Sequence, residues 1–285
     1  MALYFKTYAS SSSGNCLALW TDRTAVLIDC GLGTMKRTRA VLADMAAIAP
    51  PVSAVIISHL HSDHVAYYPL RVLEQAAIPV RVHESDLEPL RRRHFNGYGF
   101  PDLPLVPYAG PFDLPGLHIE PFPLSHQPAC PTFGFTIRTR IRNRWLKAAI
   151  ATDFNRPEDV APHLIDADFI FIESNHDLEL LKKYYNPNSR YHMPNPKTAQ
   201  LLTETRLQSK YPPAAVMLGH LSPQRNRPQL ALDTIEAHFR QHLAPPTHPP
   251  PPPPPPTPPH PPPPPPPPPL TAPQKTPSQT LTIPT

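Results

Sequence analysis

Short runs of apolar and β-branched residues recur along the first 243 residues, and stretches with a helical period lie between several of them. The runs have the length and residue types of buried strands. In chain order they are LYFKTYA, CLALW, AVLID, SAVIISH, PVRVH, LHIEPFPL, GFTIRTR, KAAIATD, ADFIFIES and AAVMLGH. Leucine and alanine repeat at helical spacing in TRAVLADMAA, YYPLRVLEQAA, SDLEPLRRRH, PKTAQLLTETRLQ and RPQLALDTIEAHFRQ. This alternation predicts an α/β fold and excludes a helical bundle.

Residues able to do chemistry follow several of the predicted strands. SAVIIS runs into His59, KAAIAT precedes Asp153, ADFIFI precedes Glu173, and AAVMLG precedes His220. A layered α/β fold exposes its loops together at the strand ends. We therefore expect these four side chains to converge from distant positions.

Proline divides the chain into two parts. It accounts for 47 of the 285 residues, and 24 of these prolines follow residue 244. Residues 1–243 have ordinary globular composition and are long enough for one domain with a sizeable core. Polyproline lacks backbone donors and apolar variety, so we expect residues 244–285 to form a disordered, extended tail outside the domain. The formal net charge of +4 is compatible with an anionic substrate but does not demand one.

The expected cellular location of the protein and the redox state of its cysteines are inferred from sequence features that are missing. The opening MALYFKTYASSSSGNC has no basic region, long apolar run or cleavage site of a signal peptide, and no segment approaches the ~20 apolar residues of a membrane span. We expect a cytoplasmic protein with no membrane association. Cys16, Cys30 and Cys130 are widely spaced and odd in number, which favours free thiols over a disulfide or a structural zinc site.

The segment SHLHSDHV concentrates four side chains that can hold a metal ion: His59, His61, Asp63 and His64. The first two are separated by one residue, so a tight loop can aim both imidazoles at one ion. The other two follow directly and suit a second ion beside the first. Zinc accepts imidazole nitrogen and carboxylate oxygen, and two neighbouring ions need a bridging carboxylate and further ligands.

Three later segments offer such ligands. SHQPACPTFGF contains His126, ATDF contains Asp153, and LGHLS contains His220. The alternative interpretation is a histidine-rich loop with unrelated histidines elsewhere. The three distant partners favour the two-metal interpretation.

The arrangement resembles the metallo-β-lactamase fold. HLHSDH fits its HxHxDH motif, LIDCG with Asp29 resembles its first motif, and the likeness covers residues 1–243. The resemblance implies a four-layer αββα sandwich that binds two divalent metal ions, with zinc expected and manganese or iron as alternatives. Asp29 would orient a histidine ligand without binding metal itself. The implied ligands are His59, His61 and His126 for one ion, Asp63, His64 and His220 for the other, and Asp153 as the bridge.

A finer resemblance is to the YycJ/WalJ-like branch, in SSSGNC, HQPACPTFGF, ESNHD and the HLS motif. That branch is associated with DNA exonuclease activity and is similar to the phosphodiesterases PhnP and tRNase Z. Two segments differ from it: VAYYP follows HSDH where the branch continues toward a glycine, and HLSPQRN stands in place of HLSN. These differences concern the substrate and leave the metal chemistry intact.

Cleaving a phosphodiester also benefits from a proton delivered to the leaving oxygen. Nuclease-like members of the fold use a Glu and a His outside the metal set, and Glu173 and His192 occur here in that order. A carboxylate bonded to one imidazole nitrogen would fix the tautomer and keep the ring cationic. The alternative is a strand-end carboxylate and a surface histidine. We assign catalytic roles to Asp63, Glu173 and His192.

Other features carry less information. Arg91–Arg93 with His94 could contact phosphates, although a basic run on a helix is usually a solvated face. The same applies to Lys182 and Lys183. The segment Ser11–Asn15 forms either a tight turn beside the site or a simple link between two strands.

The sequence therefore predicts a two-metal phosphodiesterase, most simply a nuclease, in which a metal-bridging hydroxide attacks phosphorus. Its substrate would be a nucleic acid or a small phosphodiester. One alternative is a metal-dependent hydrolase of a small ester, thioester or lactam. Another is a non-enzymatic binding module whose polyproline tail recruits SH3- or WW-like partners. The sequence does not predict an oligomeric state.

Overall fold

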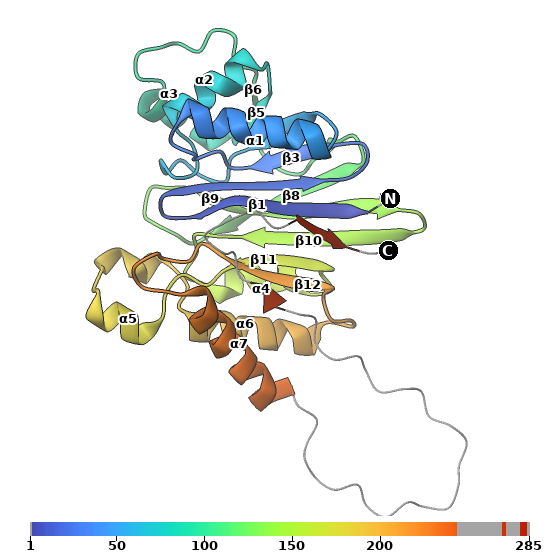
Figure 1. The fold of residues 1–285 in the computed structure, drawn as a ribbon, viewed down its shortest axis with the longest axis vertical. Coiled ribbons are helices and arrows are strands. Elements are labelled where there is room, and N and C mark those ends of the chain that lie inside the picture. The colour runs from blue at the N-terminus through green and yellow to red at the C-terminus, as the bar shows by residue number, and fades with distance from the viewer. Residues whose placement is uncertain (1, 244–269, 272–279, 284–285) are drawn as a thin grey trace, which may run out of the picture.

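Two β-sheets are stacked face to face at the centre of the molecule, and helices cover both outer faces (Figure 1). The computed structural model describes residues 2–243, 270–271 and 280–283. The strands are β1 (Leu3–Ser11), β2 (Gly14–Trp20), β3 (Ala25–Ile28), β4 (Val52–Ile56), β5 (Val80–His83), β6 (Leu105–Tyr108), β7 (Phe112–Leu114), β8 (Leu117–Leu124), β9 (Thr132–Ile141), β10 (Arg144–Ala151), β11 (Phe169–Glu173), β12 (Ala215–Gly219), β13 (Leu270–Thr271) and β14 (Thr280–Ile283). The helices are α1 (Met35–Ile48), α2 (Tyr67–Gln75), α3 (Leu87–His94), α4 (Pro157–Leu164), α5 (Leu178–Lys183), α6 (Asn195–Gln208) and α7 (Pro228–Leu243), with short 3₁₀ turns η1 (Glu84–Asp86) and η2 (Pro187–Tyr191).

Each sheet combines antiparallel hairpins with parallel strands. The first sheet has the order β14-β1-β2-β3-β4-β5-β6, and the second has the order β13-β12-β11-β10-β9-β8-β7. In the first sheet β3, β4, β5 and β6 run parallel, and in the second β10, β11 and β12 run parallel. Parallel neighbours bring their carboxyl ends to the same edge of a sheet. This places the loops after β10, β11 and β12 side by side.

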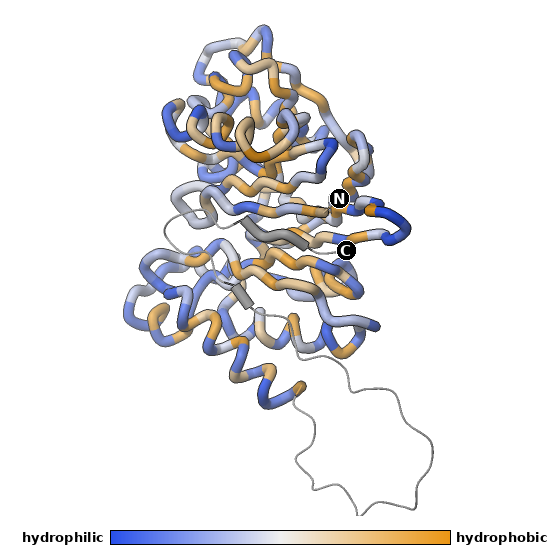
Figure 2. Tube along the Cα trace, turned by 45° about the vertical axis from the view of Figure 1, so that its right-hand side comes forward, coloured by the Kyte–Doolittle hydropathy of each residue, from blue (hydrophilic) through white to orange (hydrophobic). Residues whose placement is uncertain are grey.

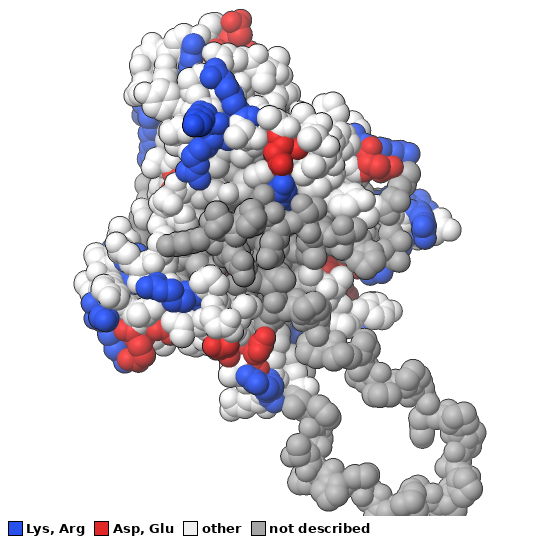
Figure 3. All heavy atoms as spheres, in the orientation of Figure 1, with Lys and Arg blue, Asp and Glu red and all other residues white. Residues whose placement is uncertain are grey.

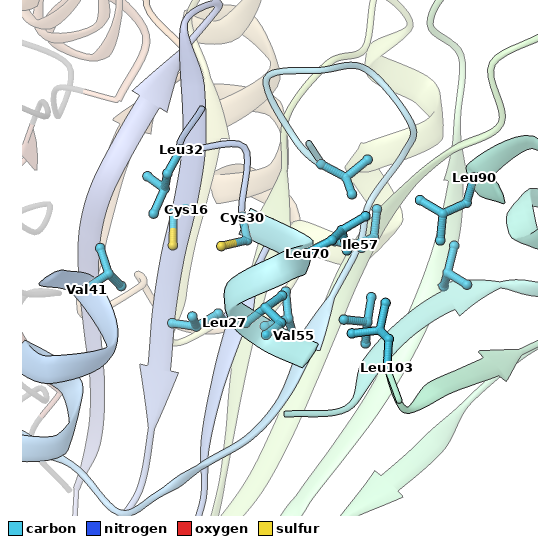
Figure 4. Close-up of a cluster of buried hydrophobic side chains, with 14 of the residues drawn as sticks. Cys16, Leu27, Cys30, Leu32, Val41, Val55, Ile57, Leu70, Leu90 and Leu103 are labelled. Atoms are coloured by element: carbon cyan, nitrogen blue, oxygen red, sulfur yellow. The ribbon is translucent and has the colours of Figure 1, made fainter. Parts of the chain in front are cut away.

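Three hydrophobic layers hold the sandwich together. The inner layer fills the space between the sheets and includes Phe5, Phe135 and Phe169. A second layer packs α1, α2 and α3 on the first sheet, and Figure 4 shows Val41, Leu70 and other members of it. The third packs α4, α6 and α7 on the second sheet. Along α7 hydrophilic and hydrophobic positions alternate in Figure 2, because only one side of that helix is buried.

These layers confirm the predicted α/β class and the αββα order. Each of the ten runs predicted as strands overlaps a strand, and the five helical patterns overlap α1, α2, α3, α6 and α7. Within residues 1–243 the pattern missed the short strands β6 and β7 and the short helices α4 and α5. Helix α5 has no buried residue, so its sequence has no apolar stripe from which a helix could be predicted.

The segment after residue 243 was predicted to be a disordered tail. Residues 244–269, 272–279 and 284–285 lie outside the described residues, so the domain boundary and the tail stay predictions. The two described pieces are edge strands: β13 pairs parallel with β12, and β14 pairs antiparallel with β1.

The three cysteines are buried free thiols, as predicted. Cys16 and Cys30 point toward one another near Leu32 in the core cluster of Figure 4. No helix in the described part of the chain is long and apolar enough to cross a membrane.

Candidate metal centre and active site

The loop after β4 folds back on itself and carries four ligand-type side chains. The amides of His64 and Val65 both donate to the carbonyl of His61, at 2.9 and 3.0 Å. His59 and His64 are fully buried, whereas His61 is partly exposed. The tight turn therefore holds imidazoles that are close in sequence on the same side of the loop.

One group of three imidazoles combines this loop with the loop after β8. His59 Nε2 lies 3.0 Å from His61 Nδ1, and His126 Nε2 lies 3.4 Å from the same nitrogen. One ligand atom from each of the three residues lies within 4.8 Å of the others. This group matches the three residues expected at the first metal position.

A second group joins the same loop to the end of β12. Asp63 Oδ2 lies 3.6 Å from His64 Nε2 and 3.7 Å from His220 Nε2. These three ligand atoms also lie within 4.8 Å of one another. The residues are those expected at the second metal position.

Asp153, in the turn after β10, lies between the two groups. Its Oδ1 is 3.7 Å from His126 Nε2, and its Oδ2 is 3.1 Å from His64 Nε2 and 3.5 Å from His220 Nε2. Burial opposes charge on this carboxylate, but His220 and His64 outweigh burial and hold the pKa of Asp153 well below its usual range. One oxygen thus faces each group, as a bridging ligand requires.

The donor atoms of this centre fit divalent metal ions. Asp153 Oδ2 and His220 Nε2 are buried, and neither makes a hydrogen bond within the described residues. A buried polar atom without a partner is costly, and here the two face each other among further imidazoles. Imidazole nitrogens and carboxylate oxygens are ligands of zinc and of other first-row metals. Cations between the groups would satisfy both atoms.

Asp29 fixes one of these histidines from behind. Its Oδ2 lies 2.7 Å from His64 Nδ1, and its two oxygens accept hydrogen bonds from the backbone N–H and the hydroxyl of Ser58, both at 2.8 Å. Burial lowers the pKa of His64, but the charges of Asp29 and Asp153 outweigh it, so the pKa is raised. Because Nδ1 is held, Nε2 faces the second group. The contact predicted for Asp29 with a histidine is confirmed.

Three of the site residues have an unusual backbone conformation. Asp29, Asp153 and His220 have φ values of 62°, 61° and 50°, in the left-handed region that non-glycine residues seldom adopt. Each follows a strand closely, where the chain turns sharply into a loop. Such conformations cluster at functional sites because the surrounding structure must maintain them.

Three loops are joined by backbone hydrogen bonds under the centre. Asn15 N donates to Asp63 O at 2.7 Å, Cys30 N donates to His64 O at 2.8 Å, and Gly31 N donates to Asn15 O at 2.9 Å. A Cβ at Gly31 would lie 1.8 Å from Asp63 O. The glycine of LIDCG is therefore needed for the close approach of these loops.

Glu173, at the end of β11, contacts two histidines through one oxygen. Oε1 lies 2.7 Å from His192 Nδ1 and 3.2 Å from His220 Nδ1, and Oε2 accepts a hydrogen bond from Phe154 N at 3.1 Å. Burial lowers the pKa of His192, but the carboxylate of Glu173 outweighs it, so this pKa is raised. The pair predicted outside the metal set is thus in hydrogen-bond contact. The second contact, with His220, was not predicted.

The centre opens into a hollow of about 200 Å³. His61, Asp63, His126, Asp153, His192 and His220 line it, together with Ser12, Gln127, Ser189 and Arg225. His192 Nδ1 is held by Glu173, and its side chain is 16% exposed, so Nε2 remains available to a ligand in the hollow.

Two asparagines in the site were not assigned from the sequence. Asn15 Nδ2 lies 2.9 Å from His64 Nε2 and 3.3 Å from Asp63 Oδ2, and Asn175 Nδ2 donates to His220 O at 2.9 Å. Asn15 ends the segment Ser11–Asn15, which both links β1 to β2 and lies beside the site. The SSSGNC and ESNHD segments contain these asparagines and were the signal that could have identified them.

Other sequence candidates lie outside the centre. Arg91, Arg92 and Arg93 are exposed on α3, and none is among the described residues that line the hollow. His94 is buried and its Nε2 lies 2.9 Å from Leu60 O, so it supports the histidine loop from outside. His163 also lies outside the centre, where it stacks on Phe122.

Comparison with known proteins places this site in a family. Residues 24–220 match the model of the beta-lactamase superfamily domain. The chain is 31% identical over 185 residues to exodeoxyribonuclease YycJ of Bacillus anthracis, covering 64% of this chain and 66% of that protein. It is 27% identical over 241 residues to exodeoxyribonuclease WalJ of Streptococcus pneumoniae serotype 2 strain D39, covering 80% and 84%. These matches confirm the resemblance to the YycJ/WalJ-like branch.

Solved structures share the fold. A diphosphatase from the PhnP family aligns with a TM-score of 0.59 at 14% identity, covering 99% of both chains. The short form of human tRNase Z aligns with a TM-score of 0.59 at 16% identity, covering 100% of both chains. At this identity the likeness concerns the arrangement of strands and helices.

Proposed function

The chain belongs to the beta-lactamase superfamily, and we propose that within it this protein is a two-metal phosphodiesterase that acts on nucleic acid. Two relatives are named exodeoxyribonucleases, which supports a nuclease with DNA as the first substrate to test. The cytoplasmic location expected from the sequence is part of the proposal. The proposal also needs a metal centre and a proton donor.

We assign the first metal position to His59, His61 and His126 and the second to Asp63, His64 and His220, with Asp153 shared. Zinc is the proposed metal, because imidazole and carboxylate ligands suit it, with manganese and iron as alternatives. When bound, two divalent ions would provide the nucleophile and neutralise the charge that develops at phosphorus. Asp29 and Ser58 hold His64 so that its Nε2 faces the centre.

The contact between Glu173 and His192 is the observation that carries the phosphodiesterase assignment. The carboxylate lies 2.7 Å from Nδ1, which fixes the tautomer and favours the charged ring. His192 can then donate the proton on Nε2 to the departing oxygen of a diester, because this side chain lines the hollow. Hydrolysis of a lactam or thioester on the same metals would not need this donor.

One assay tests the assignment. The purified chain, supplied with zinc or manganese, is offered bis-p-nitrophenyl phosphate, single- and double-stranded DNA labelled at the 5′ or 3′ end, RNA and a lactam. We expect hydrolysis of the diester and of at least one nucleic acid. Hydrolysis of the lactam alone would replace the proposal with the small-substrate hydrolase, and the position of the label in the products separates end-cutting from internal cutting.

A further inference from the structure

A second hollow opens beside the one over the candidate centre. Its volume is about 310 Å³, and it shares Asn186, Ser189 and His192 with its neighbour. The shared residues belong to η2 and to the positions that directly flank it, so this segment borders both hollows. A ligand longer than one phosphate group could therefore extend from the centre into the second hollow.

An exposed aromatic side chain lines this second hollow. Tyr185 is 78% exposed, and its neighbour Tyr184 is 44% exposed. Burying a flat aromatic face against a ligand removes this apolar area from water. Large exposed apolar side chains that gather beside a site indicate a binding surface.

Basic side chains surround the same hollow. Arg190 and Lys197 line it, and none of the described residues in its lining is acidic. The Arg190 guanidinium lies 4.7 Å from the centre of the Tyr191 ring and donates a hydrogen bond to the Tyr191 hydroxyl at 2.7 Å, which holds the charge in place. Figure 3 shows further Lys and Arg side chains, with acidic side chains beside them, over α5 at the lower left of the molecule, where Lys182 pairs with Glu179 at 2.7 Å. Lys182 and Lys183 belong to that helix and are exposed.

We propose that Tyr185, Arg190 and Lys197 form a nucleotide platform that binds the part of a single-stranded nucleic acid next to the scissile phosphate. A base would stack on Tyr185, and Arg190 and Lys197 would contact the flanking phosphates. Stacking on aromatic rings combined with basic contacts to the backbone is the usual way proteins bind single strands. A duplex keeps its base faces covered, so the platform selects a strand with unpaired bases. The inference rests on the proposed function, since it places the scissile phosphate in the neighbouring hollow.

Binding can be measured without catalysis. The full chain in EDTA is titrated into a 5′-fluorescein-labelled oligothymidylate of about twelve nucleotides, and fluorescence anisotropy gives the Kd. We expect Tyr185→Ala to raise the Kd about tenfold and Tyr185→Phe to leave it within about twofold, because the ring and not the hydroxyl makes the stacking contact. Tyr211→Ala is the matched control, since Tyr211 is 71% exposed and lies in the loop before β12.

The contributions of Arg190 and Lys197 to strand binding are measured separately, from the salt dependence of the Kd. Arg190→Gln and Lys197→Gln should each lower the slope of log Kd against log salt by about one, because each removes one phosphate contact. In the presence of metal, Tyr185→Ala should lower the ratio of kcat/KM for the oligonucleotide to kcat/KM for bis-p-nitrophenyl phosphate about tenfold.

The outcomes separate the platform from the proposed function. If the chain hydrolyses no diester but Tyr185→Ala still weakens strand binding, the platform stands and the phosphodiesterase assignment fails. If Tyr185→Ala and Tyr211→Ala change the Kd equally, the platform is wrong whatever the activity. It is also wrong if a duplex or a polyglutamate peptide binds as tightly as the strand with the same dependence on Tyr185.

Discussion

At the scale of single residues, Asp153 is the proposed ligand that both metal positions share. One oxygen faces His126 and the other faces His64 and His220, so its loss should affect both metal positions. We expect elemental analysis of the wild-type chain to approach two metal ions and Asp153→Ala to lower the occupancy of both. Asp113→Ala is the control, because that carboxylate pairs with the exposed His118. A single tightly held ion in the wild type would contradict the dinuclear assignment.

His192→Ala should separate proton donation from metal binding. We expect the variant to retain its metal ions and to cleave a diester with a poor leaving group about 10² to 10⁴ times more slowly, the usual contribution of a general acid. The loss on p-nitrophenyl diesters should be much smaller, since that group departs without a proton. His118→Ala is a matched control, because His118 also bonds a carboxylate, at 2.8 Å. Equal loss on both kinds of substrate would make His192 a substrate clamp.

Glu173→Gln should have a mixed effect because its Oε1 serves two histidines. Weakening the contact with His192 should slow cleavage of poor leaving groups, though less than His192→Ala does. Weakening the contact with His220 should lower metal affinity at the second position by about 10- to 100-fold, the usual cost of losing a carboxylate behind a histidine ligand. Both effects can be followed by titrating metal against turnover. Unchanged metal affinity with slowed turnover would show that the 3.2 Å contact with His220 does not orient that ring.

The residue types of the site could be predicted from the sequence, but not all of their contacts. His59, His61 and His64 fall in one short motif, where spacing alone indicates shared ligation. The second contact of Glu173 depends on strand register, because β11 and β12 pair Glu173 with Gly219 and so bring it next to His220. Glu173 and Gly219 are 46 positions apart, and neither strand's own sequence shows which residue of the other strand it pairs with.

At the scale of elements, the loop containing Gly31 should be the part of the site least tolerant of added volume. Gly31→Ala would place a Cβ 1.8 Å from the backbone oxygen of Asp63, so the loop between β4 and α2 must move. We expect a loss of about 1–3 kcal/mol in the free energy of unfolding, together with lower metal occupancy. Gly99→Ala is the matched control, because nothing lies within 4 Å of a Cβ there. Urea unfolding and elemental analysis measure the two effects, and equal stability of both variants would rule out the clash.

Strands and helices could be predicted where burial gives the sequence an apolar run or an apolar stripe, and they were missed where neither is present. The strands β2, β3, β11 and β12 are buried along their whole length, so their sequences are apolar runs interrupted only by Asn15 and Glu173 near the strand ends. The helix α4 contains Pro162, which interrupts a helical pattern, and α5 spans only six residues with none buried. The helix α4 still packs Val160 and Leu164 into the third layer, whereas α5 borders the second hollow through Leu181.

At the scale of the whole molecule, the site exists because the two sheets stack. The first sheet supplies the loops after β3 and β4, and the second supplies those after β8, β10, β11 and β12. The inner layer of aliphatic and phenylalanine side chains fixes the distance between the sheets, and that distance sets how closely the two sets of loops approach. Composition and periodicity predict that such a core exists. They do not give the order of strands that brings these loops to one end.

The last prediction concerns the segment after residue 243. In the described part of the chain this segment adds only β13 and β14, of two and four residues, to strands β12 and β1, which are already paired on their other sides. Such short edge strands contribute little to stability.

Deleting residues 244–285 should therefore lower the melting temperature by no more than a few degrees, because about 1 kcal/mol corresponds to roughly 2–4 °C in a domain of this size. The deletion should also leave kcat and KM for bis-p-nitrophenyl phosphate within about twofold. Differential scanning calorimetry and the diester assay give both quantities. The control is a chain that keeps residues 244–285 but carries proline at Leu281 and Thr282, which removes backbone donors of β14. A large fall in melting temperature on deletion, reproduced by the two prolines, would show that the edge strand is an integral part of the first sheet and that the domain extends past residue 243.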